Sequence, residues 1–370
     1  MQHNRNVPFF SFLNVPSNLK EEWFGAIQKV LDKGRFIGGE EVSKFEDAWA
    51  RMLGVKFAVG VGNGLDGLVL SLKALGVGEG DRVAVPSHTF IATWNAVKIV
   101  GATPVGIDVD SNGLLNLDLL EKQSNLKCVI PVHMHGAMVN MSRLATWANL
   151  NQVFVIEDAS QAHLAKSEVG YAGSLSDVGV FSLYPSKNLG ALGDAGVITT
   201  NNAVTAESIR SYANYGADTK DKYFHKSFGA NTRLDTIQAG LLNVNLQYLE
   251  AWTEHRSSLA KIYLKNINSS ESLKFLHNVP VNSVWHHFPI ITKKRQLLIE
   301  FLAKNGVATE IHYPNLAADE YSRITGEKNC EYPIGKYIAN NILSLPISQW
   351  HTAEEIQYVA STVNKFESDN

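Results

Sequence analysis

The sequence has few cysteines, no long apolar run and no large excess of one charge. Its 370 residues include only two cysteines, Cys128 and Cys330, which are too few for a disulfide framework and lack metal-site partners at useful spacing. No apolar stretch reaches the roughly 18 residues that a membrane span needs. We therefore expect a protein of the reducing cytoplasm, without disulfides and without a membrane partner.

Charge and the first residues exclude further classes. A net charge of -3, from 33 basic and 36 acidic residues, argues against nucleic acid or an anionic membrane as the main partner. The opening stretch, MQHNRNVPFFSFLNVP, lacks the apolar core and the small-residue cleavage site of a signal peptide. With 45% hydrophobic residues, the chain suits one large or two medium globular domains.

The first part of the chain alternates between helical and strand patterns. Apolar residues recur at helical spacing after Ser17, which we expect to cap that helix. Short β-rich runs follow at 82–86, 103–107, 127–132, 153–158, 177–183 and 195–200, with helical patterns at 90–100, 114–122 and 141–150 between the earlier ones. Continuous apolar strands alternating with helices predict an α/β fold with a mostly parallel central sheet sandwiched by helices.

The pattern changes after about residue 203. A long helical stretch is predicted over 231–266, followed by a strand, a helix, a strand at 307–313 and a terminal helix. We therefore expect a large α/β domain over residues 1–250, including the N-terminal segment, and a smaller α+β domain over 251–370.

Polar residues stand where predicted strands end, which is where α/β sheets place ligands. Asp158 follows an apolar strand, and Gln161 comes three residues later, a spacing that puts both side chains on one face if the segment is helical. An acid in this position is either a helix cap or a carboxylate aimed into a site. Because caps are common, position alone favours the cap.

Two further features have an ordinary explanation when each is taken alone. The segment GVGNGLDG, residues 60–67, would let backbone N–H groups approach a phosphate, but it matches no nucleotide fingerprint and is equally well a tight turn. Ser182 ends an apolar strand, and Lys187 follows on a glycine-rich loop. A lone loop lysine is usually solvated.

Together these features are the parts that a pyridoxal phosphate (PLP) site requires. Lys187 would form the Schiff base, and Asp158 would keep the pyridine nitrogen protonated so that the ring accepts carbanion electrons. The glycine turn and Ser182 would hold the phosphate. A partly desolvated pocket would also lower the pKa of the lysine, so that the amine could act as a base.

Two other chemistries have less support. His133 and His135 would share one face of a strand and could ligate a metal together, but no Cys, Asp or Glu lies near enough in sequence to complete the set, and a strand-end turn explains PVHMHG better. A serine hydrolase is not supported, because no G-x-S-x-G elbow occurs.

Motifs along nearly the whole chain resemble those of the DegT/DnrJ/EryC1/StrS aminotransferases, which make amino sugars on nucleotide carriers. In the family's order they are RFIGGEEVSKFEDAWARMLGVKFAVGVGNGLDGL, VPSHTFIATWNAV, PVHMHG, VIEDASQAH, FSLYPSKNLGALGDAGVITT, YGADTKDKYFHKSFGANTRLDTIQAGLL, EIHYP and SLPISQWHTAEEIQYV. The resemblance implies a fold type I PLP enzyme that works as a homodimer with sites at the subunit interface.

The resemblance assigns roles to the residues already singled out. It implies that Lys187 is the Schiff-base lysine and the proton shuttle, and that Asp158 pairs with the pyridine nitrogen. Gln161 is similar to the residue that contacts the phenolic oxygen of the ring, and Ser182 to a hydroxyl contact of the phosphate.

The resemblance adds residues that the pattern alone did not. Gly64 and Leu65 match the phosphate-holding turn, although the family often has threonine or serine in place of Leu65, so only backbone N–H groups remain there. Phe90 resembles a ring stacked on the cofactor, with core packing as the alternative. Asn231 resembles an asparagine that reaches the phosphate from the partner subunit, with a helix cap as the alternative.

Other matches concern the substrate. His312 and Tyr313 match the HYP segment near the sugar nucleotide. PVHMHG departs from the commoner PVHLYG by placing His135 where tyrosine is usual, and VIEDASQAHLA has Leu164 where glycine is usual. These departures bear on the shape of the substrate pocket more than on the type of reaction.

The resemblance also implies the reaction. Relatives that perform dehydration with an iron–sulfur cluster have histidine in place of the lysine, so Lys187 favours transamination, with L-glutamate as donor by family habit. VPSHTFIATWNAV resembles members that aminate carbon 3 of a dTDP-linked 3-keto-6-deoxyhexose, giving a dTDP-3-amino-3,6-dideoxyhexose for a surface polysaccharide or another glycoconjugate. Amination of carbon 4 is the alternative, and a non-catalytic PLP or sugar-nucleotide binder is the alternative from another class.

Overall fold

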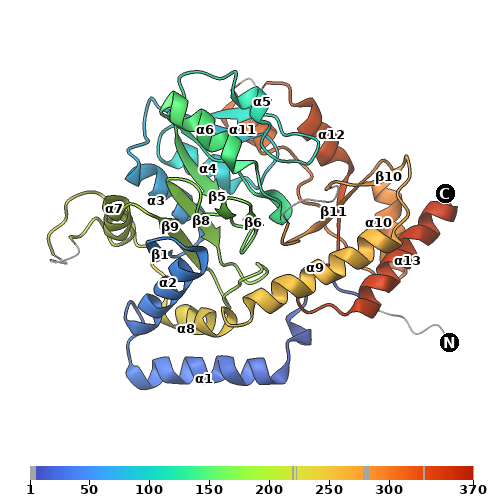
Figure 1. Ribbon diagram of the computed structural model, residues 1–370, viewed down its shortest axis with the longest axis horizontal. Coiled ribbons are helices and arrows are strands. Elements are labelled where there is room, and N and C mark those ends of the chain that lie inside the picture. The colour runs from blue at the N-terminus through green and yellow to red at the C-terminus, as the bar shows by residue number, and fades with distance from the viewer. Residues whose placement is uncertain (1–5, 219–220, 222, 278–282, 328–329, 370) are drawn as a thin grey trace.

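A seven-stranded sheet forms the centre of the molecule (Figure 1). The computed structural model describes residues 6–218, 221, 223–277, 283–327 and 330–369. In spatial order the strands are β1 (Phe57–Val61), β9 (Gly196–Thr200), β8 (Val178–Ser182), β5 (Phe154–Asp158), β4 (Cys128–Val129), β2 (Arg82–Pro86) and β3 (Thr103–Ile107). The strands predicted between residues 82 and 200 are confirmed, although β4 is much shorter than expected.

Strand directions match the expected mostly parallel sheet. The pairs from β8 through β5, β4 and β2 to β3 are parallel, whereas β9 runs antiparallel to both β1 and β8. The loop between β8 and β9 therefore starts at the same edge as the carboxyl ends of the parallel strands. This loop carries Lys187.

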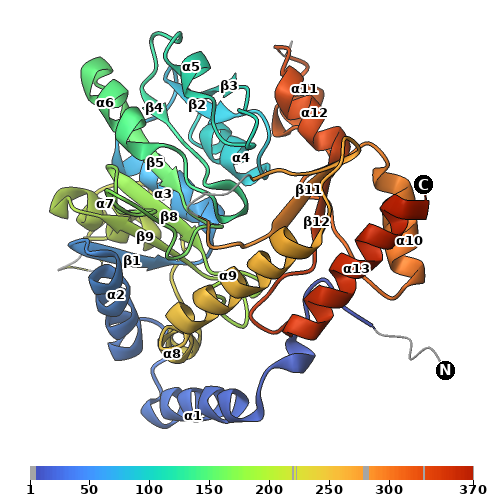
Figure 2. The same ribbon diagram turned by 45° about the vertical axis from the view of Figure 1, so that its right-hand side comes forward.

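Helices cover both faces of the sheet (Figures 1 and 2). One face is covered by α2 (Glu40–Leu53), α5 (Leu117–Leu120), α6 (Met141–Asn151) and α8 (Thr236–Asn245), the other by α3 (Gly64–Ala74), α4 (Ala92–Ile99) and α7 (Ala203–Ala213). On β2, Val83 and Val85 join the second core while Ala84 joins the first. Each strand thus buries both faces, which explains the continuous apolar runs.

The first long helix, α1 (Ser17–Lys33), lies against α8. The expected cap at Ser17 is wrong, because Ser17 is the first helical residue and the preceding Pro16 makes no side-chain cap. The helix ends at Gly34, whose φ of 62° suits a glycine C-cap. Trp23 donates from its Nε1 to Oδ1 of Asn245 at 2.7 Å, which fixes α1 on α8.

The single helix predicted over 231–266 is wrong. Residues 231–235 precede α8, and the turn at 246–248 separates α8 from α9 (Leu249–Asn266). In that turn the N–H groups of Gln247 and Tyr248 bond to carbonyls three residues back instead of four. The side chain of Asn245 also donates to the Gly190 carbonyl at 2.8 Å. These bonds redirect the chain, which apolar periodicity does not reveal.

The rest of the chain forms a smaller layered unit. An antiparallel sheet of β10 (Leu273–Phe275), β11 (Phe288–Thr292) and β12 (Ile342–Leu345) packs with α9, α10 (Arg295–Lys304) and α13 (Ala353–Asp369). The remaining elements are α11 (Ala317–Thr325), α12 (Pro333–Asn341), β6 (Lys166–Ser167), β7 (Gly170–Tyr171) and the 3-10 turns η1 (Phe12–Asn14) and η2 (Met134–Gly136).

The strand predicted at 307–313 is wrong as a continuous element. Only isolated bridges form there, from Val307 to Val7 and from Glu310 to Ser344. Because Val7 bonds to this part of the chain, the N-terminal segment lies beside the smaller unit. The division into domains at residue 250 stays a prediction.

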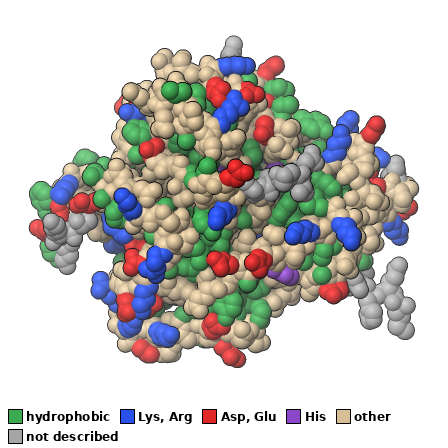
Figure 3. All heavy atoms as spheres, in the orientation of Figure 1, with side chains coloured by type: hydrophobic (Ala, Val, Ile, Leu, Met, Phe, Trp, Pro, Cys, Tyr) green, Lys and Arg blue, Asp and Glu red, His purple; other side chains and the backbone are tan. Residues whose placement is uncertain are grey.

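The surface agrees with the low net charge. On the face shown in Figure 3, basic and acidic side chains are intermixed. Among the described residues, no helix combines the length and the apolar character that a membrane crossing needs. Cys128 is buried and Cys330 is exposed, and neither is in a disulfide.

Candidate active site

A cavity of about 390 Å³ opens where the carboxyl ends of β5 and β8 meet the start of α3. All the predicted site residues except Asn231 line it: Gly64, Leu65, Phe90, Asp158, Gln161, Ser182, Lys187, His312 and Tyr313. These residues come from distant parts of the sequence. The fold therefore brings together groups that the sequence could only name separately.

Lys187 lies half-buried in the cavity wall. The loop that carries it is closed by Leu183, which donates to the Ala195 carbonyl and accepts from the N–H of Ala191, each at 2.8 Å. Burial of the ammonium lowers the pKa of Lys187 to about 8, and the Asp158 carboxylate opposes this shift in part. The reading of Lys187 as an ordinary solvated loop residue is wrong.

Asp158 ends β5 and is only 6% exposed. Residues 159–165 form turns and no helix, so the helix-cap interpretation of Asp158 is wrong. Its Oδ2 accepts from the Thr93 hydroxyl at 3.0 Å, and its Oδ1 accepts from the Ser160 N–H at 3.2 Å. Sequence reasoning missed Thr93, which lies in α4. Its local pattern does not distinguish a threonine that bonds to a strand-end carboxylate from any other threonine of a helix.

Gln161 is fixed at both ends of its amide. Its Oε1 accepts from the His135 N–H at 2.6 Å, and its Nε2 donates to the Tyr313 hydroxyl at 3.3 Å. Burial raises the pKa of Tyr313, so the phenol stays protonated. The Phe90 ring lies 5.5 Å from the Tyr313 ring and is 54% exposed, so the core-packing reading of Phe90 is wrong.

The glycine turn makes an anion cradle. Asn63 caps α3 by accepting from the Asp66 N–H at 2.8 Å. A Cβ on Gly64 would stand 2.9 Å from the Ser182 Cβ and 3.4 Å from the Ser160 Oγ, so only glycine lets the helix start approach the end of β8. Leu65 has no hydroxyl, but a serine hydroxyl lies close to the turn. It belongs to Ser160, whose Oγ accepts from the Ser182 N–H at 3.2 Å.

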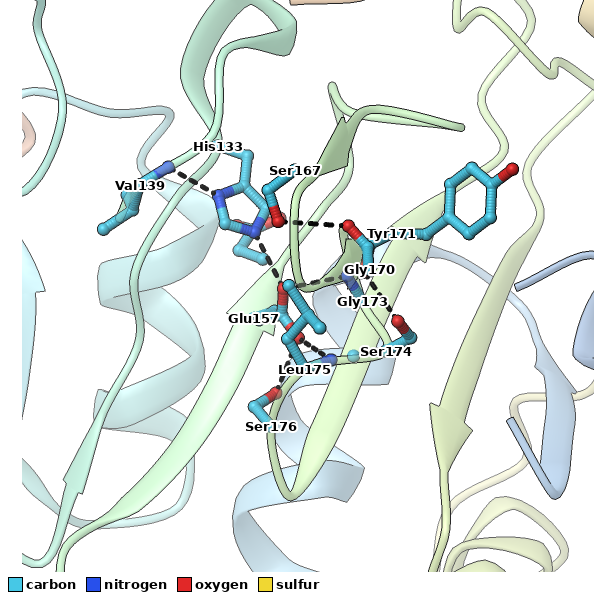
Figure 4. A network of polar contacts seen from close by, with 12 residues as sticks. His133, Val139, Glu157, Ser167, Gly170, Tyr171, Gly173, Ser174, Leu175 and Ser176 are labelled. Atoms are coloured by element: carbon cyan, nitrogen blue, oxygen red, sulfur yellow. Dashed lines mark hydrogen bonds and ion pairs between the residues drawn. The ribbon is translucent and has the colours of Figure 1, made fainter. Parts of the chain in front are cut away.

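A buried network behind the cavity holds β5 in place (Figure 4). His133 accepts at Nδ1 from the Val139 N–H at 3.2 Å, so its proton is on Nε2, which donates to Glu157 at 3.0 Å. Glu157 also accepts from the N–H groups of Gly173 and Leu175 and from the Ser176 hydroxyl, at 2.8 to 2.9 Å.

This network bears on the hypothesis that His133 and His135 ligate a metal together. The ring of His133 bonds to Glu157, whereas the ring of His135 contacts His287. Within the described ranges, no group of three or more His, Cys, Asp or Glu side chains could hold a metal. His133 is therefore a structural residue.

Sequence reasoning also missed the histidines of the cavity wall, His286 and His287. Asn188 donates from Nδ2 to the Val284 carbonyl at 3.1 Å, so its Oδ1 must accept from Nδ1–H of His286 at 3.2 Å. Burial lowers the pKa of His286 well below its usual value. The neutral ring therefore keeps an unprotonated Nε2. The adjacent histidines in WHHFPIIT were the available signal.

Asn231 lies apart from these residues. It is exposed, and the N-cap of α8 is Asp235, so the helix-cap reading of Asn231 is wrong.

The pKa of Lys187 gives a testable pH dependence. Because burial penalises the ammonium, the free amine of the apoprotein should appear through pH about 8, and not near the ~10.4 of a solvated lysine. Between these values the unfolded chain binds more protons, so the stability of the apoprotein should rise with pH in that window.

Brief acetylation at graded pH, read by peptide mass spectrometry, measures the midpoint at Lys187. Lys261, exposed on α9, serves as the reference for reagent reactivity. A Lys187 midpoint near that of a solvated lysine would contradict the desolvation.

Gly64→Ala tests the anion cradle. The added Cβ, 2.9 Å from the Ser182 Cβ, should force α3 away from β8 and weaken PLP binding by roughly tenfold or more, through lost backbone hydrogen bonds. Equilibrium dialysis measures the affinity. Gly25→Ala is the matched control, because its Cβ would meet nothing within 4 Å and alanine suits a helix interior better. Equal affinities would rule out the close approach.

Comparisons with known proteins agree with this geometry. The DegT/DnrJ/EryC1/StrS aminotransferase family model matches residues 17–364. The dTDP-3-amino-3,4,6-trideoxy-alpha-D-glucose transaminase of Streptomyces venezuelae is 38% identical, covering 92% of this chain and 91% of its own. The dTDP-3-amino-3,6-dideoxy-alpha-D-galactopyranose transaminase of Aneurinibacillus thermoaerophilus is 37% identical, covering 97% and 99%.

Solved structures give the same result. The crystal structure of S. venezuelae DesV in complex with a ketimine intermediate superposes with a TM-score of 0.93 at 36% identity, covering 98% of both chains. The side chains of the cavity also fit PLP, since a lysine, a buried carboxylate and an anion cradle converge there. The chain belongs to the DegT/DnrJ/EryC1/StrS family, and it is a PLP-dependent sugar aminotransferase.

Proposed function

We propose that this enzyme transfers the amino group of L-glutamate to a dTDP-linked 3-keto-6-deoxyhexose, giving a dTDP-3-amino-3,6-dideoxyhexose for glycoconjugate synthesis. The observation that carries the reaction type is the presence of Lys187 and Asp158 in one cavity. The names of the two relatives above support dTDP as the carrier and carbon 3 as the site of amination.

The side chains of the cavity would orient the cofactor. Bound PLP supplies an electron sink for the carbanion that forms when a proton leaves the substrate carbon. Asp158, fixed by Thr93 and Ser160, would pair with the pyridine nitrogen and keep it protonated. Gln161 would contact the ring oxygen, and Phe90 would lie against the ring face.

The phosphate would be held at the start of α3. Positive partial charge at a helix N-terminus favours an anion, and Gly64 allows the backbone N–H groups there to come close. The hydroxyls of Ser182 and Ser160 line the same corner of the cavity. This arrangement would offset the hydroxyl that Leu65 cannot provide.

Lys187 would move the proton in both halves of the reaction. A pKa of about 8 leaves an appreciable fraction of free amine near neutral pH, which a solvated lysine does not offer. As a base the amine would take a proton from one carbon, and as an acid it would return that proton to the other. Burial around the cavity also limits the access of water to that proton.

We infer that the working unit is a homodimer in which Asn231 completes the partner's phosphate site. Asn231 is exposed and does not line its own cavity. Large apolar side chains in neighbouring segments are also exposed: Phe36, Ile37, Tyr215, Phe224 and Phe228. Covering such side chains in a subunit interface would remove apolar surface from water and favour association.

Two alternatives remain as outcomes of the test. Amination of carbon 4 would use the same lysine and cofactor with a different placement of the sugar. A PLP or sugar-nucleotide binder without turnover would keep the fold, but the desolvated Lys187 beside Asp158 favours the enzyme.

Turnover of dTDP-3-keto-6-deoxyhexose against dTDP-4-keto-6-deoxyhexose, with L-glutamate, tests the substrate. We expect preferential use of the 3-keto sugar and a 3-amino product by NMR, because both relatives described above are named as transaminases of 3-amino sugars. Lys187→Ala should abolish turnover and the visible absorbance of bound PLP. A clear preference for the 4-keto sugar would overturn the substrate assignment, and PLP binding without turnover would favour the binder.

Co-expression of Lys187→Ala with Asn231→Ala tests the shared site. Each variant alone should be impaired, whereas a mixed dimer contains one site with an intact lysine and an intact asparagine. Random mixing should restore about a quarter of the wild-type activity, because a two-fold dimer has two equivalent sites. Full activity of Asn231→Ala alone, or no recovery on mixing, would refute the role of Asn231.

A further inference from the structure

Two histidines that the proposed reaction does not use contact each other beside the cavity. Nδ1 of His135 lies 3.2 Å from Nδ1 of His287. The two residues are 152 positions apart in the sequence. The contact thus joins two segments that are far apart along the chain.

Backbone bonds bring the two segments together. Val284 donates its N–H to the Gly136 carbonyl at 3.1 Å, and His287 donates its N–H to the His135 carbonyl at 3.4 Å. His135 has a φ of 59°, in the left-handed region where the chain turns sharply, and its side chain contacts His287. His135 also donates its own N–H to Gln161, a bond that does not depend on its side chain.

His287 is held on its face as well as at its edge. Its ring stacks on His312 with centroids 3.8 Å apart and planes 14° apart, and His312 is fixed by a 3.0 Å hydrogen bond between its Nδ1 and the Ser344 hydroxyl. Burial lowers the pKa of both His135 and His287 well below the usual value. Neutral His135 and His287 rings avoid the repulsion that two adjacent imidazolium ions would suffer.

The remaining polar atom of His287 is Nε2. It makes no hydrogen bond with any described residue, while the residue lines both the cofactor cavity and an adjoining cavity of about 330 Å³. Tyr184, Ser186, His286, His287 and His312 are common to the two cavities. An acceptor sugar bound across this shared wall would meet Nε2.

We propose that His287 Nε2 hydrogen-bonds to a ring hydroxyl of the acceptor sugar, and that His135 is a positioning residue that sets the tautomer and orientation of His287. This inference rests on the proposed function and deepens it. A neutral imidazole carries one proton. If His135 donates to Nδ1, then Nε2 of His287 is a donor to the sugar, and if His135 accepts, then Nε2 is an acceptor.

Binding and tautomer measurements on the PLP-loaded enzyme test the two parts separately. His287→Phe keeps a ring to stack on His312 but removes Nε2, and His135→Phe removes the partner. His135→Asn places an amide near the position of Nδ1, and asparagine tolerates positive φ. His255→Asn, whose imidazole bonds to the His351 carbonyl, is the control for loss of a histidine away from the wall.

Calorimetry with a dTDP-linked 6-deoxyhexose that lacks the ketone needs no turnover. We expect both phenylalanine variants to weaken binding by about tenfold, the size of one lost hydrogen bond. The double variant should be no weaker than either single variant, because His135 acts through His287. His135→Asn should recover most of the affinity. The half-reaction with L-glutamate should change by less than about threefold, since the wall residues contact the sugar.

Nitrogen-15 NMR of labelled histidine measures the tautomer of His287, which should not change if His135 had only a structural role. The His287 signals, identified from their absence in His287→Phe, should show one tautomer in wild type and an altered or mixed population in His135→Phe. An unchanged His287 tautomer in His135→Phe, or in His135→Ala where the phenylalanine variant folds poorly, would overturn the positioning role.

The remaining outcomes separate this inference from the proposed function. Wild-type affinity in His287→Phe overturns the sugar contact and leaves the aminotransferase intact. Additive losses in the double variant overturn the coupling. A wild-type enzyme that binds no dTDP-linked deoxyhexose overturns the proposed substrate and the sugar contact together, while the NMR comparison still decides the role of His135.

Discussion

The site depends on two adjacent carboxylates at the end of β5. Successive side chains of a strand point to opposite faces, so Glu157 and Asp158 serve different purposes. Glu157 is fully buried and accepts hydrogen bonds from His133, from two backbone N–H groups and from the Ser176 hydroxyl. A buried charge is tolerated only with such partners. By tying the 133–139 loop and the 173–176 turn to one strand end, Glu157 holds the frame in which Asp158 faces the cavity.

Much of this architecture follows from local sequence patterns. Continuous apolar runs identified the strands because both faces of the sheet are covered, and each strand end carried its polar residue directly after the run. The same local logic failed where a contact from elsewhere decides the outcome. Asp158 looks like a cap until the turn at 159–165 replaces the expected helix, and the helix predicted over 231–266 is divided where Asn245 bonds to Trp23 and Gly190. Phe90 has the pattern of a core aromatic but is exposed beside the cavity.

The residues missed in the site share one physical reason. Thr93, Ser160 and His287 act through partners more than a turn away or from another segment, and a hydroxyl or imidazole has no sequence signal for such a partner. Leu164, in contrast, was singled out from the sequence, because the resemblance places it where glycine is usual. The backbone there has a φ of 64°, a conformation that favours glycine. The Leu164 side chain is 9% exposed and packs in the core, and this burial offsets part of the cost of the backbone conformation.

Sugar selection has a different physical basis from catalysis in this cavity. Lys187 and Asp158 exploit charge, and burial tunes the amine towards its free base. The histidines beside the cavity provide neutral groups, because His135, His286 and His287 all have their pKa lowered by burial. A neutral imidazole offers one donor and one acceptor, and its partner decides which nitrogen carries the proton. Such a wall can distinguish hydroxyl orientations, since a misplaced hydroxyl leaves a buried nitrogen unsatisfied. Changes in this wall can therefore alter the sugar that is recognised without altering the groups that move the proton.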